Sequence, residues 1–244
     1  MSVITINEFF ASLFNSVPST AKSDRNIEIT KIYFGFDGKG GTSMEATGQI
    51  YGLTRESVRQ ITHRVCRDIS LNDTVDWSVL DRCIEIVNEL APCSAEHVET
   101  ALFEKGLLTR PFLVEGILNA ASAFSRVEKS AFVTKLQEAR FVVTKKTESW
   151  PKRVMSAATK RVSHNGAVSV DQLSKSMRGL TKEHRESFVR NVIDSVESAV
   201  WVGDNSKAWA YFGDKGRNRF LSRVSKIFSV ASDVSINEIE DAQQ

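Results

Sequence analysis

Charged and amide side chains recur on one side of the segment that follows Thr54. They are Arg55, Glu56, Arg59, Gln60, His63 and Arg64. Val58, Ile61 and Val65 lie between them at helical spacing, which predicts a helix with these three residues inward and the polar side chains outward. Arginine pairs bidentately with guanine, glutamine pairs with adenine, and glutamate accepts from cytosine. These residue types therefore suit contact with base edges near the start of the helix.

The residues before this helix predict a second helix and a tight turn. Ser43 is a suitable N-cap for a helix that runs to Tyr51. Gly52 can take the positive φ that a short turn between crossed helices needs, and Thr54 can cap the next helix. The segment from Ser43 to Cys66 is therefore predicted to be a helix-turn-helix.

The string GFDGKGGTSMEATGQIYGLTRESVRQI resembles region 4 of the sigma-70 family of RNA polymerase specificity factors. The resemblance spans roughly residues 20–69, and its specific part is TRESVRQI, beginning at Thr54. It implies a helix-turn-helix whose second helix lies in the major groove of double-stranded DNA. By alignment it implies DNA contact by Arg55, Glu56, Arg59 and Gln60, and we add His63 and Arg64 on the same helix.

The chain departs from the family pattern at three positions, which leaves the DNA sequence that it would bind open. Ser57 stands where the family usually has arginine, and Thr47 and Tyr51 replace inward-facing aliphatic residues. In the family, the part before the helix-turn-helix also docks on RNA polymerase. Here that contact and a purely structural role for the preceding helices both remain open.

Composition limits the class of protein. The chain has 244 residues, of which 41% are hydrophobic, enough for two or three small domains. It has three cysteines and no recognisable leader peptide, which favours a reducing cytoplasm. No apolar run is long enough to cross a membrane, so we expect no membrane partner.

Positive charge is concentrated in one part of the chain. The net charge is only +2, but residues 152–230 hold 15 Lys and Arg against 7 Asp and Glu. Attraction for phosphate is therefore expected to be strongest there.

The chain after residue 73 predicts the same order of elements twice. Three helices, over 77–90, 94–105 and 110–124, precede a hairpin over 131–136 and 140–145. Three further helices, over 151–164, 170–177 and 183–198, precede strands over 199–203 and 207–213. Three helices and a hairpin are the order of a winged helix, and the agreement indicates duplication at a period of roughly 70 residues.

The predicted fold is mainly α, with a sigma region 4-like helix-turn-helix followed by two winged-helix units with small β-hairpins. The expected boundaries are 1–73, 74–149, 150–214 and 215–244. The last segment contains a helix over 217–231, and residues 234–242 resemble 167–176 at the same offset. It is expected to be a partial third repeat, with the chain then the start of a longer protein, or a cap that folds back.

The second unit supplies further candidate phosphate contacts. They are Arg185, Arg190 and Lys207 on the third helix and wing, and the basic helix with Arg217, Arg219 and Arg223. Solvated faces explain the same residues equally well. Trp201 is expected in the core, whereas Trp209 and Tyr211 remain open as stacking residues. The first winged unit is acidic, so it is expected to bind protein or to act as a spacer.

No catalytic, metal or cofactor site is expected. The four histidines have no spaced carboxylate or cysteine partner, and the glycine-rich segment 34–42 lacks the lysine of a phosphate-binding loop. The leading hypothesis is a sequence-specific DNA-binding transcriptional regulator. The alternatives are the recognition portion of a larger DNA-processing or anti-phage defence protein, and a protein-interaction scaffold. The oligomeric state is left open.

Overall fold

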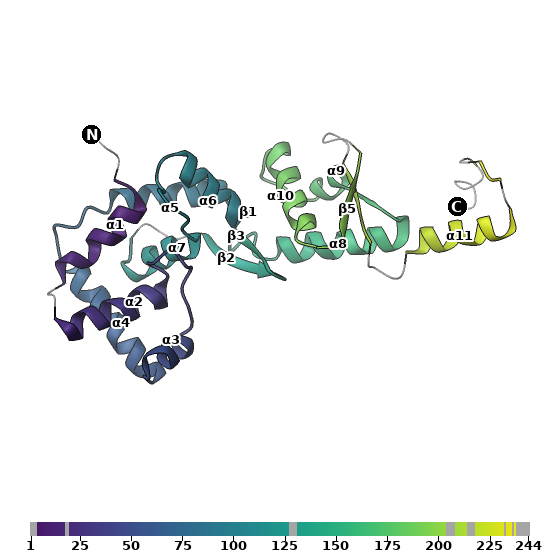
Figure 1. The fold of residues 1–244 in the computed structure, drawn as a ribbon. Coiled ribbons are helices and arrows are strands. Elements are labelled where there is room, and N and C mark those ends of the chain that lie inside the picture. Colours follow the sequence, from purple (N-terminus) through teal and green to yellow (C-terminus); the bar gives the residue numbers. More distant parts are fainter. Residues whose placement is uncertain are drawn as a thin grey trace. The chain divides into compact units, whose positions relative to one another are not determined.

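The structure is a computed structural model that describes residues 4–17, 20–126, 131–203, 208–213, 218–231, 233–235 and 237. It is mainly helical, with two small antiparallel sheets of three strands each (Figure 1). The chain forms two compact units. The first comprises residues 1–135 and 140–148, and the second comprises 136–139 and 149–244.

The first unit contains most of the helices. Its elements are α1 (Ile6–Leu13), a 3-10 turn η1 (Phe14–Ser16), α2 (Ala21–Phe34), α3 (Met44–Tyr51), α4 (Arg55–Ser70), α5 (Ser78–Leu90), β1 (Cys93–Ser94), α6 (Ala95–Glu104), α7 (Val114–Ala123), β2 (Ala131–Leu136) and β3 (Ala139–Thr144). The tip of the β2–β3 hairpin, residues 136–139, is grouped with the second unit.

The second unit repeats the order of the elements from α5 to β3. Its elements are α8 (Trp150–Asn165), β4 (Val168–Ser169), α9 (Val170–Ser174), α10 (Lys182–Asp194), β5 (Ala199–Val202), β6 (Trp209–Phe212) and α11 (Arg219–Val230). In each sheet a two-residue strand pairs antiparallel with the last strand, which lies in the centre, giving the orders β1-β3-β2 and β4-β6-β5. The predicted order of elements is thus confirmed for both repeats.

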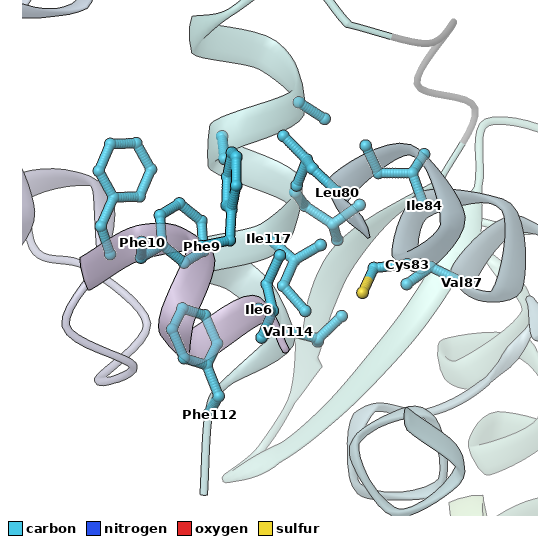
Figure 2. Close-up of a cluster of buried hydrophobic side chains, with 14 of the residues drawn as sticks. Ile6, Phe9, Phe10, Leu80, Cys83, Ile84, Val87, Phe112, Val114 and Ile117 are labelled. Atoms are coloured by element: carbon cyan, nitrogen blue, oxygen red, sulfur yellow. The ribbon is translucent and has the colours of Figure 1, made fainter. Parts of the chain in front are cut away.

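One hydrophobic core runs through the first unit from α1 to β3. Figure 2 shows part of it, with side chains from α1, α5 and α7 in contact. The Phe10 ring stacks on Phe36 at 5.0 Å and on Phe112 at 5.3 Å between centroids. The boundary expected at 73/74 is therefore not a break in packing, because aromatic rings from both sides of it share one core. Periodicity within single helices carries no information on such long-range contacts.

The glycine-rich loop between α2 and α3 attaches the helix-turn-helix segment to α7. Leu113 N donates to the Gly38 carbonyl at 2.9 Å, and Asn119 Nδ2 donates to the Phe34 carbonyl at 2.9 Å. An added Cβ at Gly116 would lie 2.3 Å from the Gly35 carbonyl oxygen. The loop therefore reverses the chain, as predicted, and also needs glycine on α7 for close approach.

A half-buried ion cluster fixes β3 to α6 and α7. Arg140 Nη1 lies 2.9 Å from Glu99 Oε1 and 2.7 Å from Glu115 Oε2. Glu99 also accepts from Val114 N at 3.0 Å, so its carboxylate caps the start of α7. One guanidinium thereby balances two carboxylates and orients the cap.

Replacing Arg140 with Gln should lower the free energy of unfolding of the first unit by about 1–3 kcal/mol, because two partly buried carboxylates lose their counter-charge. Urea unfolding followed by circular dichroism measures the change. Lys135→Gln removes an exposed cation from the same hairpin and should alter stability by less than about 0.5 kcal/mol. Equal effects of the two changes would mean that the ion cluster contributes nothing.

Candidate nucleic-acid interface

α3 and α4 form a helix-turn-helix whose ends are defined by local hydrogen bonds. Ser43 Oγ accepts from Ala46 N at 3.0 Å, and Thr54 Oγ1 accepts from Ser57 N at 3.2 Å. Gly52 has φ of 64° and ends α3 in the left-handed conformation. The two caps and the glycine turn predicted from sequence are therefore present in the structure.

α4 is held by a buried face that packs on α2 and α3. The buried side chains are Val58, Thr62, Val65, Cys66 and Ile69. Ile61, which was expected inward with Val58 and Val65, is only half-buried, and Thr62 is buried instead. The Thr62 hydroxyl can enter this face because it donates to the Arg59 carbonyl at 3.1 Å.

All six candidate DNA-contacting residues of α4 are exposed. They are Arg55, Glu56, Arg59, Gln60, His63 and Arg64. The first four lie in the first two turns, beside the turn at Gly52. This end of α4 therefore presents a polar surface to solvent.

The exposed side chains of α4 are already organised by ion pairs. Arg59 donates through Nε at 2.8 Å and through Nη2 at 2.7 Å to the two oxygens of Glu56. Gln60 Nε2 donates to the same carboxylate at 3.0 Å. Hydrogen bonds from Arg59 and Gln60 lower the pKa of Glu56 to about 2, so this carboxylate is ionised throughout the neutral range.

Hydrogen bonds hold Thr47 and the end of α3 to neighbouring parts of the first unit. Thr47 is fully buried, and its hydroxyl donates to the Ser43 carbonyl at 2.9 Å and lies 2.7 Å from Thr42 Oγ1. The carbonyl of Tyr51 accepts from Arg25 Nη2 at 2.8 Å, which ties the end of α3 to α2. The buried hydroxyl of Thr47 is therefore satisfied within the first unit.

Gly48 sets how closely α3 approaches the turn. A Cβ added there would lie 2.5 Å from the carbonyl oxygen of Leu53. Gly48→Ala should therefore destabilise the first unit by about 1–3 kcal/mol, although alanine normally favours a helix. Thermal unfolding measures this loss. Ala46→Gly on the same helix is the control for helix propensity. It should lower the free energy of unfolding by about 1 kcal/mol through propensity alone, without crowding. A stable Gly48→Ala protein would contradict the crowded geometry.

In the second unit, two of the candidate phosphate contacts are engaged within the unit. Arg185 is half-buried, and its Nη1 donates to the Met177 carbonyl at 3.0 Å. The Arg190 guanidinium lies 5.6 Å from the centroid of the Trp201 ring. Trp201 is half-buried and donates to Asp194 Oδ1 at 2.7 Å, so its expected place in the core is wrong. Its indole N–H needs a partner, and Asp194 provides one at the surface.

The remaining candidates lie on α11 or outside the described residues. Arg219 and Arg223 are exposed on α11, and Arg219 Nη1 lies 3.4 Å from His164 Nδ1 at the end of α8. Lys207 and Arg217 fall outside the described residues, as does most of the segment 234–242 that resembles 167–176. On β6, Trp209 is exposed, Tyr211 is half-buried and Phe212 is buried.

The described residues hold no cluster suited to a metal ion, no reactive cysteine and no helix able to span a membrane. No cluster of three or more His, Cys, Asp and Glu side chains suited to a metal ion occurs among them. Cys66, Cys83 and Cys93 are buried, and burial raises the pKa of each thiol to about 12. Such thiols are poor nucleophiles at neutral pH. Within the same described ranges, every helix is too short or too polar to span a bilayer.

The fold and site define a mainly helical protein with an exposed polar helix end in its first unit. Comparison with protein-family models, with curated proteins and with solved structures found no match for this chain. Its function must therefore be inferred from the chemistry of the site itself.

Proposed function

We propose that this protein binds double-stranded DNA at a specific sequence and acts as a transcriptional regulator. The observation that carries the proposal is the exposed N-terminal end of α4, with Arg55, Glu56, Arg59 and Gln60 on a firmly packed helix-turn-helix. An α-helix with its side chains is about 10–12 Å wide, which suits the major groove of about 12 Å.

The Glu56–Arg59 pair supports base readout by Arg59. Glu56 occupies the side of the guanidinium formed by Nε and Nη2. The end of the guanidinium, with Nη1 and the second hydrogen of Nη2, still offers two parallel donors, the pattern that pairs with guanine O6 and N7. The ion pair thus orients Arg59 before binding and lowers the conformational entropy that the contact costs.

The two repeats are best interpreted as winged-helix units. Each has three helices and a three-stranded sheet in which a short strand after the first helix pairs with the last strand. In this proposal they extend the DNA footprint beyond the site that α4 reads. The three buried, free cysteines suit the reducing cytoplasm in which such a regulator would work.

Selection of bound sites from a random duplex pool tests the proposal. The full chain should enrich a short sequence that it binds at least about a thousandfold more tightly than a scrambled duplex at physiological salt. Binding without enrichment would overturn sequence-specific recognition. Absence of binding to any duplex at low salt would overturn DNA binding altogether.

A further inference from the structure

The first helix of the second repeat, α8, carries a cationic stripe on its exposed side. Arg153, Lys160 and His164 recur at helical spacing on the side opposite the buried Val154, Ala158 and Val162. All three are exposed. The sequence from Ser149 to Val170 contains no aspartate or glutamate. Positive charge on α8 is therefore not compensated within its own helix.

α11 continues this stripe. Its first turn lies beside the end of α8 (Figure 1). There Asn218 Nδ2 donates to the Gly166 carbonyl at 3.3 Å, and Arg219 Nη1 lies 3.4 Å from His164 Nδ1. Phe220 packs against Gly166, since a Cβ added there would lie 2.8 Å from its ring. Arg219, Arg223 and Lys226 recur along one side of α11, which also lacks acidic residues.

Among the described residues, two lysines around α9 and the start of α10 form ion pairs within the unit, unlike the cations of α8 and the start of α11. Lys175 pairs with Asp171 at 2.7 Å, and Lys182 pairs with Glu186 at 3.7 Å. Arg153, Lys160 and Arg219 form no ion pair with any carboxylate of the described residues. Arg185 on α10 is half-buried. Exposed cations that can meet an external anion thus line α8 and α11, whereas the exposed Arg178 stands between the paired Lys175 and Lys182. α11 was expected from sequence to contact phosphate, and α8 was not.

The dimensions of the stripe match a polyanion better than a single small anion. Arg153 and Lys160 are separated by about 10 Å along α8, at 1.5 Å per residue. Duplex DNA carries a phosphate about every 3.4 Å along each strand. Cations spaced along two successive helices can therefore meet several phosphates of one backbone, whereas one phosphate group could contact only one or two of them.

We infer that Arg153, Lys160, Arg219 and their neighbours on α8 and α11 form a sequence-independent contact surface for the phosphate backbone of duplex DNA. This inference rests on the proposed function and adds that the two units contact different parts of the DNA. α4, which belongs to the first unit, contacts base edges and gives sequence preference. The stripe on the second unit contacts phosphates and adds affinity for duplex DNA of any sequence. Neither role requires a fixed arrangement of the two units.

The test compares two triple variants of the full chain that lose the same charge. The stripe variant carries Arg153→Gln, Lys160→Gln and Arg219→Gln. The control carries Lys175→Gln, Arg178→Gln and Lys182→Gln, which neutralises exposed cations around α9 and the start of α10. Binding to the selected site and to a scrambled duplex is measured by fluorescence anisotropy at several salt concentrations, after circular dichroism has shown that both variants are folded.

The stripe variant should bind both duplexes about a hundredfold more weakly at 0.1 M salt, and its slope of log K against log salt should fall by about 2 to 3. Its preference for the selected site over the scrambled duplex should not change. The control should retain most of its affinity and salt slope. If the control loses as much as the stripe variant, or the stripe variant loses nothing, the inference is overturned.

Two further outcomes separate this inference from its rivals. If the wild-type chain binds duplexes with a salt slope that the stripe variant lowers, but no site is ever enriched, the stripe stands and the proposed function of α4 fails. α11 also exposes Leu221 and Phe228 on the side opposite its cations, so vesicles with phosphatidylserine form a second arm of the test. Binding to these vesicles without binding to DNA would overturn the inference in favour of an anionic membrane surface.

Discussion

Replacing Phe10 with alanine is expected to lower the free energy of unfolding of the first unit by about 3–5 kcal/mol, since it removes a buried ring from a packed core. Phe10 is 3% exposed and lies between the rings of Phe36 and Phe112. The loss should shift the thermal midpoint by roughly 10 °C for a unit of this size. Differential scanning calorimetry measures the shift.

Phe103→Ala provides the matched control. The same ring is removed in the same unit, but Phe103 is 58% exposed on α6 and should cost less than about 1 kcal/mol. Because Phe10 contacts residues on both sides of position 73, its replacement should weaken the helix-turn-helix and the first repeat together. Separate transitions, with only one of them shifted, would contradict a single core in this unit.

Arg59→Ala is expected to cost about 1–3 kcal/mol at the selected DNA site, which corresponds to a loss of roughly 5- to 150-fold in affinity. The affinity for a scrambled duplex should change far less, because the lost contact is to a base edge. Base preference at one position of the site should relax. Anisotropy titrations against the site and its single-base variants measure all three effects.

Arg67→Ala is the control for this change. Arg67 is an exposed arginine in the last turn of the same helix, paired with Asp68 at 3.2 Å, and lies far from the N-terminal end. It should weaken binding by less than about threefold and leave base preference intact. If Arg59→Ala weakens every duplex equally, Arg59 contacts phosphate and not a base.

The local elements around the site could be predicted from sequence because their signals are local. Capping by Ser43 and Thr54 and the left-handed turn at Gly52 depend only on neighbouring residues. The same holds for the two helical repeats, whose order follows from periodicity and turn residues. Exposure of Arg55 and Arg59 follows from the apolar face on the other side of α4.

Long-range relations could not be predicted in this way. The stacking of Phe10 with Phe36 and Phe112 joins three segments that are far apart in sequence, so the boundary expected at 73/74 does not separate two cores. The inward bonding of Arg185 and the position of Trp201 depend on a carbonyl and a carboxylate from other turns. The cationic side of α8 is present in the sequence as a run without acidic residues. The order of a winged helix, however, favoured α10, the wing and the basic helix α11 as the phosphate contacts.

Methylation interference on the selected site is the most direct test of the central claim, that the start of α4 reads bases in the major groove. Guanine N7 lies in that groove, so its methylation blocks a bidentate arginine contact. For the wild-type chain, methylation of at least one guanine should abolish binding. For Arg59→Ala, methylation of that same guanine should no longer matter. Interference that is identical for both proteins, or absent from every guanine of the site, would contradict the account.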